Sequence, residues 1–284
     1  MNEDDVGVTI THVVQVEDIP HLHCFDVEEA HDNAASKAYA MIDCGMFENQ
    51  TLKSNEFLYI DLETYHPVLG TNEHDTFVHF KEVKKRRIEQ VTDPFNHVYY
   101  VFRFITEDGV DKEHANQTYV EIFMYTDSPL NIKLIEVIDH TVLRLDSFTL
   151  ADYQLHLNKV YLLIKNVGLY QLRLSSSQRI TIQAITEVKQ NINRFRVDQL
   201  GFNDDLNVIM ANDNTAYQYE WDTFTQPNLI MKYSLMPGST VEQIFVDYNF
   251  VIVHAWATVD GQQDRRTWIF TKSTPLYTHA FGSF

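Results

Sequence analysis

The chain has 284 residues, of which 44% are hydrophobic and 13% aromatic, so it is long and apolar enough to bury a substantial core. Its formal net charge of −18 opposes attraction to nucleic acid and to anionic membrane surfaces, and we expect neither as a partner. Aromatic and β-branched residues are plentiful, which favours pleated strands over helices.

The N-terminal segment predicts one extra strand. Residues 8–16 (VTITHVVQV) alternate apolar and polar side chains, so we assign residues 1–20 to an edge or closing strand. The first ten residues lack the basic and apolar regions of a signal peptide, and no apolar run is long enough to cross a bilayer. These features favour an intracellular chain without membrane insertion, while the sequons at Asn49 and Asn116 leave compartment and glycosylation open.

A strand motif then recurs five times along the chain. The copies are KAYAMID at 37, HVYYVFR at 97, KVYLLIK at 159, DLNVIMA at 205 and NFVIVHA at 249. The first three carry a tyrosine at the third position, and successive copies are 60, 62, 46 and 44 residues apart. Uneven loops account for the difference, so the motif indicates a repeat of about 45 residues where the loops are short.

Each copy is flanked by further predicted strands, so each unit contains four. One apolar run precedes every copy, as in HLHCFDV at 21 and TVLRLDSFTL at 141, and two runs follow it. The last run of a unit is visible as DTFVHFKEV at 75 in the first unit and PLYTHAF at 275 in the fifth. The resulting units span residues 21–84, 85–139, 140–188, 189–236 and 237–284.

Four short strands per repeat predict an all-β chain in which residues 21–284 form a β-propeller of about five four-stranded blades. Tandem β-sandwich domains are the alternative, because both architectures use short alternating strands. No long stretch has the apolar spacing of a helix. The nearest approach is VEEAHDNAASKAYAM at 27, which predicts at most one helical turn.

The units resemble degenerate WD40-type blades in their third strands. A WD40 third strand ends in Trp-Asp, and Trp221 and Asp222 form that dipeptide in YEWDT, while Asp61 alone remains in YIDLET. The Gly-His that opens a WD40 repeat is absent from all five units. The resemblance therefore implies a β-propeller rather than membership of the WD40 family.

Two clusters suggest metal or anion binding, and both have simpler explanations. His21, His23 and Cys24 lie close together, but the second ligand pair typical of structural zinc is missing, so we predict no metal. We expect free buried thiols at Cys24 and Cys44, although two cysteines can form one disulfide. The basic run at 84–87 (KKRR) is interpreted as a solvated strand end or turn, with anion binding as the alternative.

Carboxylates recur near the first strand of each unit, which suggests a glycan-binding or glycoside-hydrolysing channel as a second function. Such an enzyme needs two carboxylates about 5 to 10 Å apart across the sugar. The simpler interpretation is that these aspartates shape turns by bonding to nearby backbone groups. The residues are Asp26, Asp93, Asp146, Asp198 and Asp247.

The sequence shows no motif of an enzyme or a cofactor site. It contains no G-x-S-x-G, no phosphate loop and no dinucleotide fingerprint, and a hairpin turn explains the NDN at 212–214 better than calcium binding does. We therefore predict no catalytic residue, no cofactor and no small-molecule ligand.

The predicted function is a non-catalytic scaffold that binds other proteins through its loops, within a larger assembly. The first two units exceed the shorter ones by about 15 residues, much of it in 45–54 and 106–117, between the second and third strands. We predict that these two loops form a protein-binding surface, with tolerated insertions as the alternative. Its apolar anchors are Met46 and Phe47, and its acidic rim is Glu107, Asp108, Asp111 and Glu113.

Overall fold

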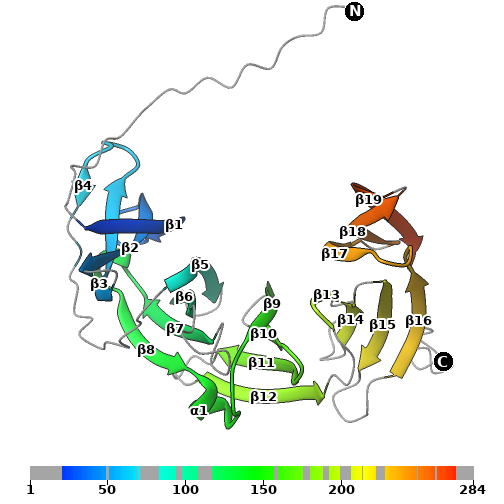
Figure 1. Cartoon of the computed structure of the whole chain (residues 1–284). Helices are drawn as coiled ribbons and strands as arrows, with labels where there is room; N and C mark the ends of the chain where they lie inside the picture. The colour runs from blue at the N-terminus through cyan, green and yellow to red at the C-terminus, as the bar shows by residue number, and fades with distance from the viewer. Residues whose placement is uncertain are drawn as a thin grey trace, which may run out of the picture. The chain divides into compact units, whose positions relative to one another are not determined.

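The computed structural model describes residues 21–272 except 49–50, 69, 71–82, 94–97, 108–116, 157–158, 175–179, 188–191, 199–205, 213, 222–227, 248 and 260. The described chain is almost entirely strand, arranged in five antiparallel sheets (Figure 1), so the all-β prediction is confirmed. It divides into two compact units, Met1–Asp139 and His140–Phe284. We name the sheets A to E in chain order. Sheets A and B belong to unit 1, and sheets C, D and E belong to unit 2.

Sheet A has the strand order β1-β2-β3-β4. Its strands are β1 (Leu22–Asp32), β2 (Lys37–Glu48), β3 (Thr51–Asp61) and β4 (Pro67–Val68). The aspartates that end β1 and β3 shape the turns that follow. Asp32 Oδ1 accepts a hydrogen bond from the Ala35 amide at 2.7 Å, and Asp61 Oδ1 accepts bonds from the Glu63 and Thr64 amides at 2.9 and 3.0 Å. Aspartate favours such turns because its short side chain reaches its own backbone.

Sheet B has the strand order β5-β6-β7-β8. Its elements are β5 (Val83–Asp93), β6 (Val98–Glu107), β7 (Thr118–Tyr125), the 3-10 helix η1 (Pro129–Asn131) and β8 (Lys133–Ile138). The β6 strand is buried on both faces over most of its length, as expected for its unbroken apolar and aromatic sequence. Ser128 caps η1 by accepting a hydrogen bond from the Leu130 amide at 3.4 Å.

The core of unit 1 lies between sheets A and B, and aromatic side chains dominate it. Phe57 of β3 meets Phe123 of β7 edge to face at 5.1 Å, and Tyr99 of β6 stacks on Tyr125 of β7 at 4.7 Å. Both separations lie in the range that aromatic pairs prefer. At one edge of this core β1 lies next to β5, so the first strands of the two sheets are neighbours.

Unit 2 contains three sheets. Their strand orders are β12-β11-β10-β9 in sheet C, β13-β14-β15-β16 in sheet D and β17-β18-β19 in sheet E. After the one-turn helix α1 (His140–Leu143), the strands are β9 (Leu150–His156), β10 (Lys159–Ile164), β11 (Gly168–Leu174), β12 (Ile180–Glu187), β13 (Arg194–Asp198), β14 (Leu206–Ala211), β15 (Thr215–Trp221), β16 (Asn228–Ser234), β17 (Thr240–Val246), β18 (Phe250–Val259) and β19 (Gln262–Thr271).

Sheet D packs on both of its faces. On one face, Val208 and Met210 of β14 join a core with sheet C, and on the other face Ile209 and Ala211 join a core with sheet E. Successive side chains of a strand point to opposite faces, so the apolar run of β14 serves two cores at once. In this unit, too, first strands are neighbours, because β13 lies next to both β9 and β17.

The face of sheet E that points away from sheet D carries exposed apolar side chains beside a polar row of Gln243, His254 and Thr267. Phe245, Ile252 and Ile269 lie directly opposite one another across the three strands, and Phe245 and Ile269 are 43% and 64% exposed. Phe250 and Trp256 extend this row along β18 and are also exposed. We call these five side chains the outer row of sheet E.

The five predicted strand starts are confirmed, since β2, β6, β10, β14 and β18 begin within one residue of 37, 97, 159, 205 and 249. Residues 27–41, the nearest approach to a helical pattern, form most of the β1–β2 hairpin instead. Three strand predictions fall wholly or partly outside the described residues: 8–16, 275–281 and all of 75–83 except its last residue.

One predicted strand is largely wrong, and sheet B begins slightly earlier than predicted. The run 141–150 was predicted to be a strand, but it begins in α1 and becomes a strand only at Leu150. The Leu145 amide donates to the His140 carbonyl at 2.8 Å, which closes a turn that a strand would not form. The fourth strand of sheet A is β4, near residue 67, and Val83 begins β5, so sheet B starts two residues before the predicted boundary at 85.

No helix in the described part of the chain has the length and hydropathy needed to cross a membrane.

Candidate functional site

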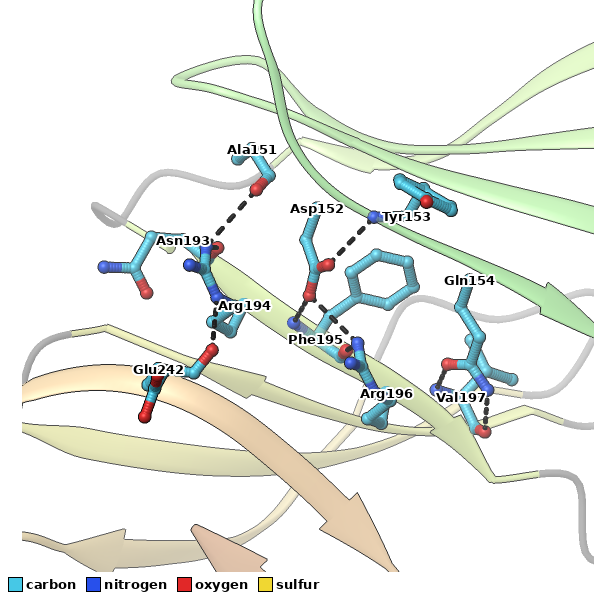
Figure 2. Close-up of polar contacts among 10 residues, drawn as sticks. All are labelled: Ala151, Asp152, Tyr153, Gln154, Asn193, Arg194, Phe195, Arg196, Val197 and Glu242. Carbon is cyan, nitrogen blue, oxygen red and sulfur yellow. Dashed lines mark hydrogen bonds and ion pairs between the residues drawn. The ribbon is translucent and has the colours of Figure 1, made fainter. Parts of the chain in front are cut away.

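The polar groups with the clearest pattern lie where first strands of neighbouring sheets meet. In unit 2, Asp152 and Gln154 of β9 reach across to the backbone of β13 (Figure 2). Asp152 Oδ2 accepts a hydrogen bond from the Phe195 amide at 3.1 Å. Gln154 Oε1 accepts one from the Val197 amide at 2.6 Å, and Gln154 Nε2 donates to the Val197 carbonyl at 3.0 Å. The two side chains thus replace a strand partner for β13, and we call this arrangement a side-chain seam.

Two arginines of β13 complete the seam in unit 2. Arg196 Nη1 lies 3.0 Å from Asp152 Oδ2 and donates to the Phe195 carbonyl. Burial raises the pKa of Asp152, and the attraction of the Arg196 guanidinium opposes that rise. A charged carboxylate with this partner and a backbone donor is the arrangement that half-buried aspartates need.

Arg194 joins three first strands (Figure 2). Its Nε donates to the Glu242 carbonyl of β17 at 2.8 Å, and its Nη1 donates to the Ala151 carbonyl of β9 at 3.3 Å. Because guanidinium donors form a rigid fork, one side chain can hold two neighbouring backbones in register.

The same seam exists in unit 1. Asp26 Oδ2 of β1 accepts a hydrogen bond from the Ile88 amide of β5 at 3.1 Å, and Glu28 accepts one from the Gln90 amide. In both units the aspartate also accepts a bond at 3.0 Å from the amide that follows it in the chain. The shared pattern is therefore Asp-x-Glu or Asp-x-Gln in a first strand, which contacts two alternate amides of the next first strand.

A buried ion cluster reinforces the contact between sheets A and B. Arg86 Nε donates to Asp43 Oδ2 at 2.9 Å, while Arg103 Nε lies 2.8 Å from Asp43 Oδ1 and Arg103 Nη1 lies 2.8 Å from Glu121 Oε2. All four residues are at most 3% exposed. Two positive and two negative charges balance, which is the condition under which buried ions are tolerated.

Aromatic rings surround the arginines of this cluster. The Arg86 guanidinium lies 4.5 Å from the Phe25 ring centre, and the Arg103 guanidinium lies 4.1 Å from that of Phe57 and 4.8 Å from that of Phe123. Burial lowers the pKa of Arg86; burial also opposes the charge of Arg103, but Asp43 and Glu121 raise its pKa overall. Arginine keeps its charge in such an environment, so the cluster is ionic.

The prediction of a solvated strand end at 84–87 is wrong for Arg86. Lys85 and Arg87 are exposed, but Arg86 lies between them on the opposite face of β5 and is buried against Asp43. Strand alternation explains the difference, because neighbouring residues point to opposite faces. In this run Arg86 points toward the core, and Asp43 is its acidic partner.

The prediction of a binding loop at 45–54 is wrong in its structure. Strand β2 continues to Glu48 and β3 begins at Thr51, so the extra residues lengthen a hairpin and do not form a loop. Met46 is half-buried and lies opposite Leu22 and Ser54, and Phe47 lies opposite Leu52. Their role in protein binding stays a prediction.

The second predicted loop lies largely outside the described residues. Glu107 ends β6, and its amide donates to the Gln117 carbonyl at 2.9 Å, so the two ends of the segment are held together. Asp108, Asp111 and Glu113 are in the range 108–116 that the structure does not describe. Asn116 is in the same range, and Asn49 is in the undescribed pair 49–50.

The recurring aspartates do not share one role. Asp26 belongs to the seam of unit 1, and Asp247 Oδ1 accepts a hydrogen bond from the Asn249 amide at 3.1 Å, as the turn interpretation predicts. Asp93 and Asp198 end β5 and β13, and Asp146 lies in the bend after α1. Asn212 Oδ1 likewise accepts bonds from the amides of the 212–215 hairpin turn, at 2.9 and 3.2 Å.

The expectation of free thiols is wrong, because Cys24 and Cys44 form a disulfide between β1 and β2. The Cys24 sulfur, which a zinc site would need as a ligand, is therefore bonded to the Cys44 sulfur instead. His23 is an exposed neighbour of Cys24, and His21 precedes β1 with a positive φ of 68°. The described residues contain no group of three histidine, cysteine or acidic side chains placed to hold a metal ion.

Neither the seam nor the ion cluster was predicted from the sequence. The signal for the seam was present as FDVEEA at 25–30 and ADYQLH at 151–156, each of which places Asp and Glu or Gln two residues apart in a first strand. The apolar residues of the second strands repeat more clearly than this polar pattern does. The cluster left no signal of its own, because its four residues are dispersed from 43 to 121.

Comparison with known proteins does not assign a family. No family model and no curated protein matches the chain. Among solved structures it is similar to one from a structural and mechanistic analysis of two prolyl endopeptidases, at 11% identity and a TM-score of 0.43, over 87% of this chain and 35% of that chain. It is also similar to a putative glycoside hydrolase from Parabacteroides distasonis ATCC 8503, at 8% identity and a TM-score of 0.32, over 87% and 86% of the two chains. Neither likeness contributes to the argument on function.

Proposed function

We propose that the five sheets are the blades of one β-propeller, which acts as a non-catalytic scaffold for other proteins. The observation that carries the propeller is the packing within each unit. Sheet D packs on both faces, whereas a sheet of a simple two-layer sandwich packs on one. First strands of successive sheets are neighbours at β1 and β5, β9 and β13, and β13 and β17, as blades arranged around an axis require.

The exposed outer row of sheet E supports a closed ring over an open stack. Four of its five large apolar side chains are exposed, which is unfavourable in water, and soluble monomers rarely expose such side chains close together without a use for them. A ring leaves no blade face uncovered, so closure would bury this row. Tandem sandwiches would leave it in water.

The scaffold role is supported by what the seam carboxylates do. Asp26 and Asp152 each accept hydrogen bonds from two backbone amides, and Asp152 also pairs with Arg196. Carboxylates committed to backbone donors in this way stabilise the chain. A glycosidase would instead need two acids facing a sugar, one of them free to give up a proton.

The binding surface that we propose is the acidic segment 107–116, with Met46 and Phe47 on the neighbouring hairpin of unit 1. The hydrogen bond from the Glu107 amide to the Gln117 carbonyl holds the two ends of the segment together, so a short turn can replace the residues between them. Replacing residues 108–116 with Asn-Gly would leave a two-residue hairpin loop of the type that suits antiparallel strands.

The experiment compares this loop deletion with a matched control, Asn166→Gly. Asn166 lies in the turn between β10 and β11, which are the second and third strands of sheet C as β6 and β7 are of sheet B. Asn166 has a positive φ of 60°, so glycine fits its conformation. Each variant is used to capture partners from native extract, with the mass of the complex measured. We expect both variants to keep the melting temperature of the parent, and only the deletion to lose a stoichiometric protein partner. If both variants capture the protein partner equally well, this surface does not bind the partner.

A second measurement separates the scaffold from the glycan-acting alternative. Oligosaccharides should leave the melting temperature unchanged if the chain is a scaffold. A saturable rise in melting temperature that disappears on Asp152→Asn would favour a glycan site.

A further inference from the structure

The Cys24–Cys44 disulfide has one accessible and one inaccessible half. Cys24 is exposed in β1, and its register partner Cys44 in β2 is fully buried, with 0% exposure. A thiolate that attacks a disulfide must reach one sulfur along the bond axis, so access decides which residue it modifies. Cys24 is the exposed residue of the pair, so attack is expected at its sulfur.

The bond also lies where sheet A is held to sheet B. A β-bulge falls between Cys24 and Asp26, so the disulfide lies two residues before the aspartate of the unit 1 seam. On the other strand, Cys44 follows Asp43 of the ion cluster, and Arg86 Nη2 donates to the Cys44 carbonyl at 3.4 Å. The disulfide therefore joins the backbone of the seam to the backbone of the cluster.

We propose that Cys24–Cys44 is a thiol-exchange site that accepts a small cationic or neutral thiol at Cys24. The preference for such thiols follows from the net charge of −18, which repels anionic ones. In the first step the thiolate attacks the Cys24 sulfur, the disulfide breaks, and Cys44 leaves as a thiolate that takes up a proton. The product is a mixed disulfide on Cys24.

A second thiol completes the reaction. Its thiolate attacks the small-molecule sulfur of the mixed disulfide, which releases a symmetrical small disulfide and the Cys24 thiolate, which is then protonated. Two small thiols are oxidised to one disulfide, and the protein gains two electrons and two protons. Opening the bond removes the covalent link between β1 and β2, and the seam and the ion cluster are then held by non-covalent contacts alone.

The first test uses the unmodified full chain and cysteamine, followed by acid quenching and mass measurement. If the disulfide exchanges in the native state, its rate of opening should rise in proportion to the cysteamine concentration. The cysteamine adduct should map to Cys24. A rate that becomes independent of cysteamine would mean that the bond opens only when the chain unfolds, and an adduct on Cys44 would place the reactive sulfur on the other strand. Either result overturns the proposal.

The second test compares the two single-cysteine variants, using cystamine as the probe. Cys44→Ser leaves the exposed thiol and Cys24→Ser leaves the buried one. We expect Cys44→Ser to form its adduct at least about tenfold faster, because accessible thiols react and buried ones are inert. Equal rates, or a faster reaction of Cys24→Ser, contradict the proposal. If either variant fails to fold, the adduct map of the unmodified chain decides alone.

Discussion

Glu28 and Gln154 occupy the same position in the two side-chain seams, and they differ mainly in charge. Each accepts a hydrogen bond from an amide of the next first strand, and Gln154 also donates one to the Val197 carbonyl. An ionised Glu28 has no proton to donate. Burial raises the pKa of Glu28 above its ordinary value of 4.5, with Glu89 of β5 and with Asp26 and Glu29 of β1 adding repulsion.

We predict that Glu28→Gln stabilises the chain and that the gain grows with pH. A carboxyl whose pKa is raised by folding contributes its full stability below 4.5, and that contribution is lost as the pH rises through the folded-state pKa. Glutamine keeps the neutral form at every pH. The melting temperature of the variant should therefore match that of the parent near pH 4 and exceed it at pH 7.

The matched control is the reverse exchange, Gln154→Glu. It should lower the melting temperature at pH 7, because a carboxylate cannot donate to the Val197 carbonyl and would lie near Asp152. If Glu28→Gln gives a melting temperature below that of the parent at pH 7, the two seams are not equivalent.

Arg86 and Arg87 provide a second comparison, between neighbours on β5. Arg86→Met leaves Asp43 buried with one partner fewer and should cost about 3 to 5 kcal/mol in the free energy of unfolding. Arg87→Met changes an exposed side chain and should stay within about 0.5 kcal/mol. Urea unfolding of both variants measures the difference. Similar costs would show that Arg86 is not the buried member of the ion cluster.

At the scale of elements, strand positions could be predicted wherever apolar alternation was strong. β2, β6, β10, β14 and β18 lie in the middle of their sheets, and their apolar runs located them to within one residue. The fourth strand of sheet A was harder to predict, because β4 is only two residues long and leaves almost no pattern. The Gly, Asn and Ser residues of the 45–54 segment favour a loop, but extended pairing between β2 and β3 holds the segment in a hairpin.

The polar contacts between sheets could be predicted much less well. A seam depends on which first strands become neighbours, and that is a property of the fold. The Asp-x-Glu pattern at 26 has many possible meanings in a sequence, and it becomes a seam only because β5 presents the Ile88 and Gln90 amides to it. The disulfide could not be predicted for the same reason, since only the β1–β2 register places Cys24 opposite Cys44.

For the whole molecule, the outer row of sheet E distinguishes a ring from an open arrangement. If a ring covers the row, Ile269→Lys places a charge in an apolar contact and should lower the melting temperature by at least about 2 to 4 °C. Leu229→Lys is the control, because Leu229 is also an exposed apolar residue, 41% exposed against 64% for Ile269, and it lies on β16, a fourth strand. Circular dichroism melts of the two variants measure the contrast. If neither substitution changes the melting temperature, the outer row is exposed to water and no ring covers it.

Differential scanning calorimetry of the full chain tests the proposed propeller most directly. A closed ring should unfold in one transition whose calorimetric and van't Hoff enthalpies agree, because blades that cover one another lose their packing together. Two separable transitions, one for Met1–Asp139 and one for His140–Phe284, would contradict the ring and favour tandem domains.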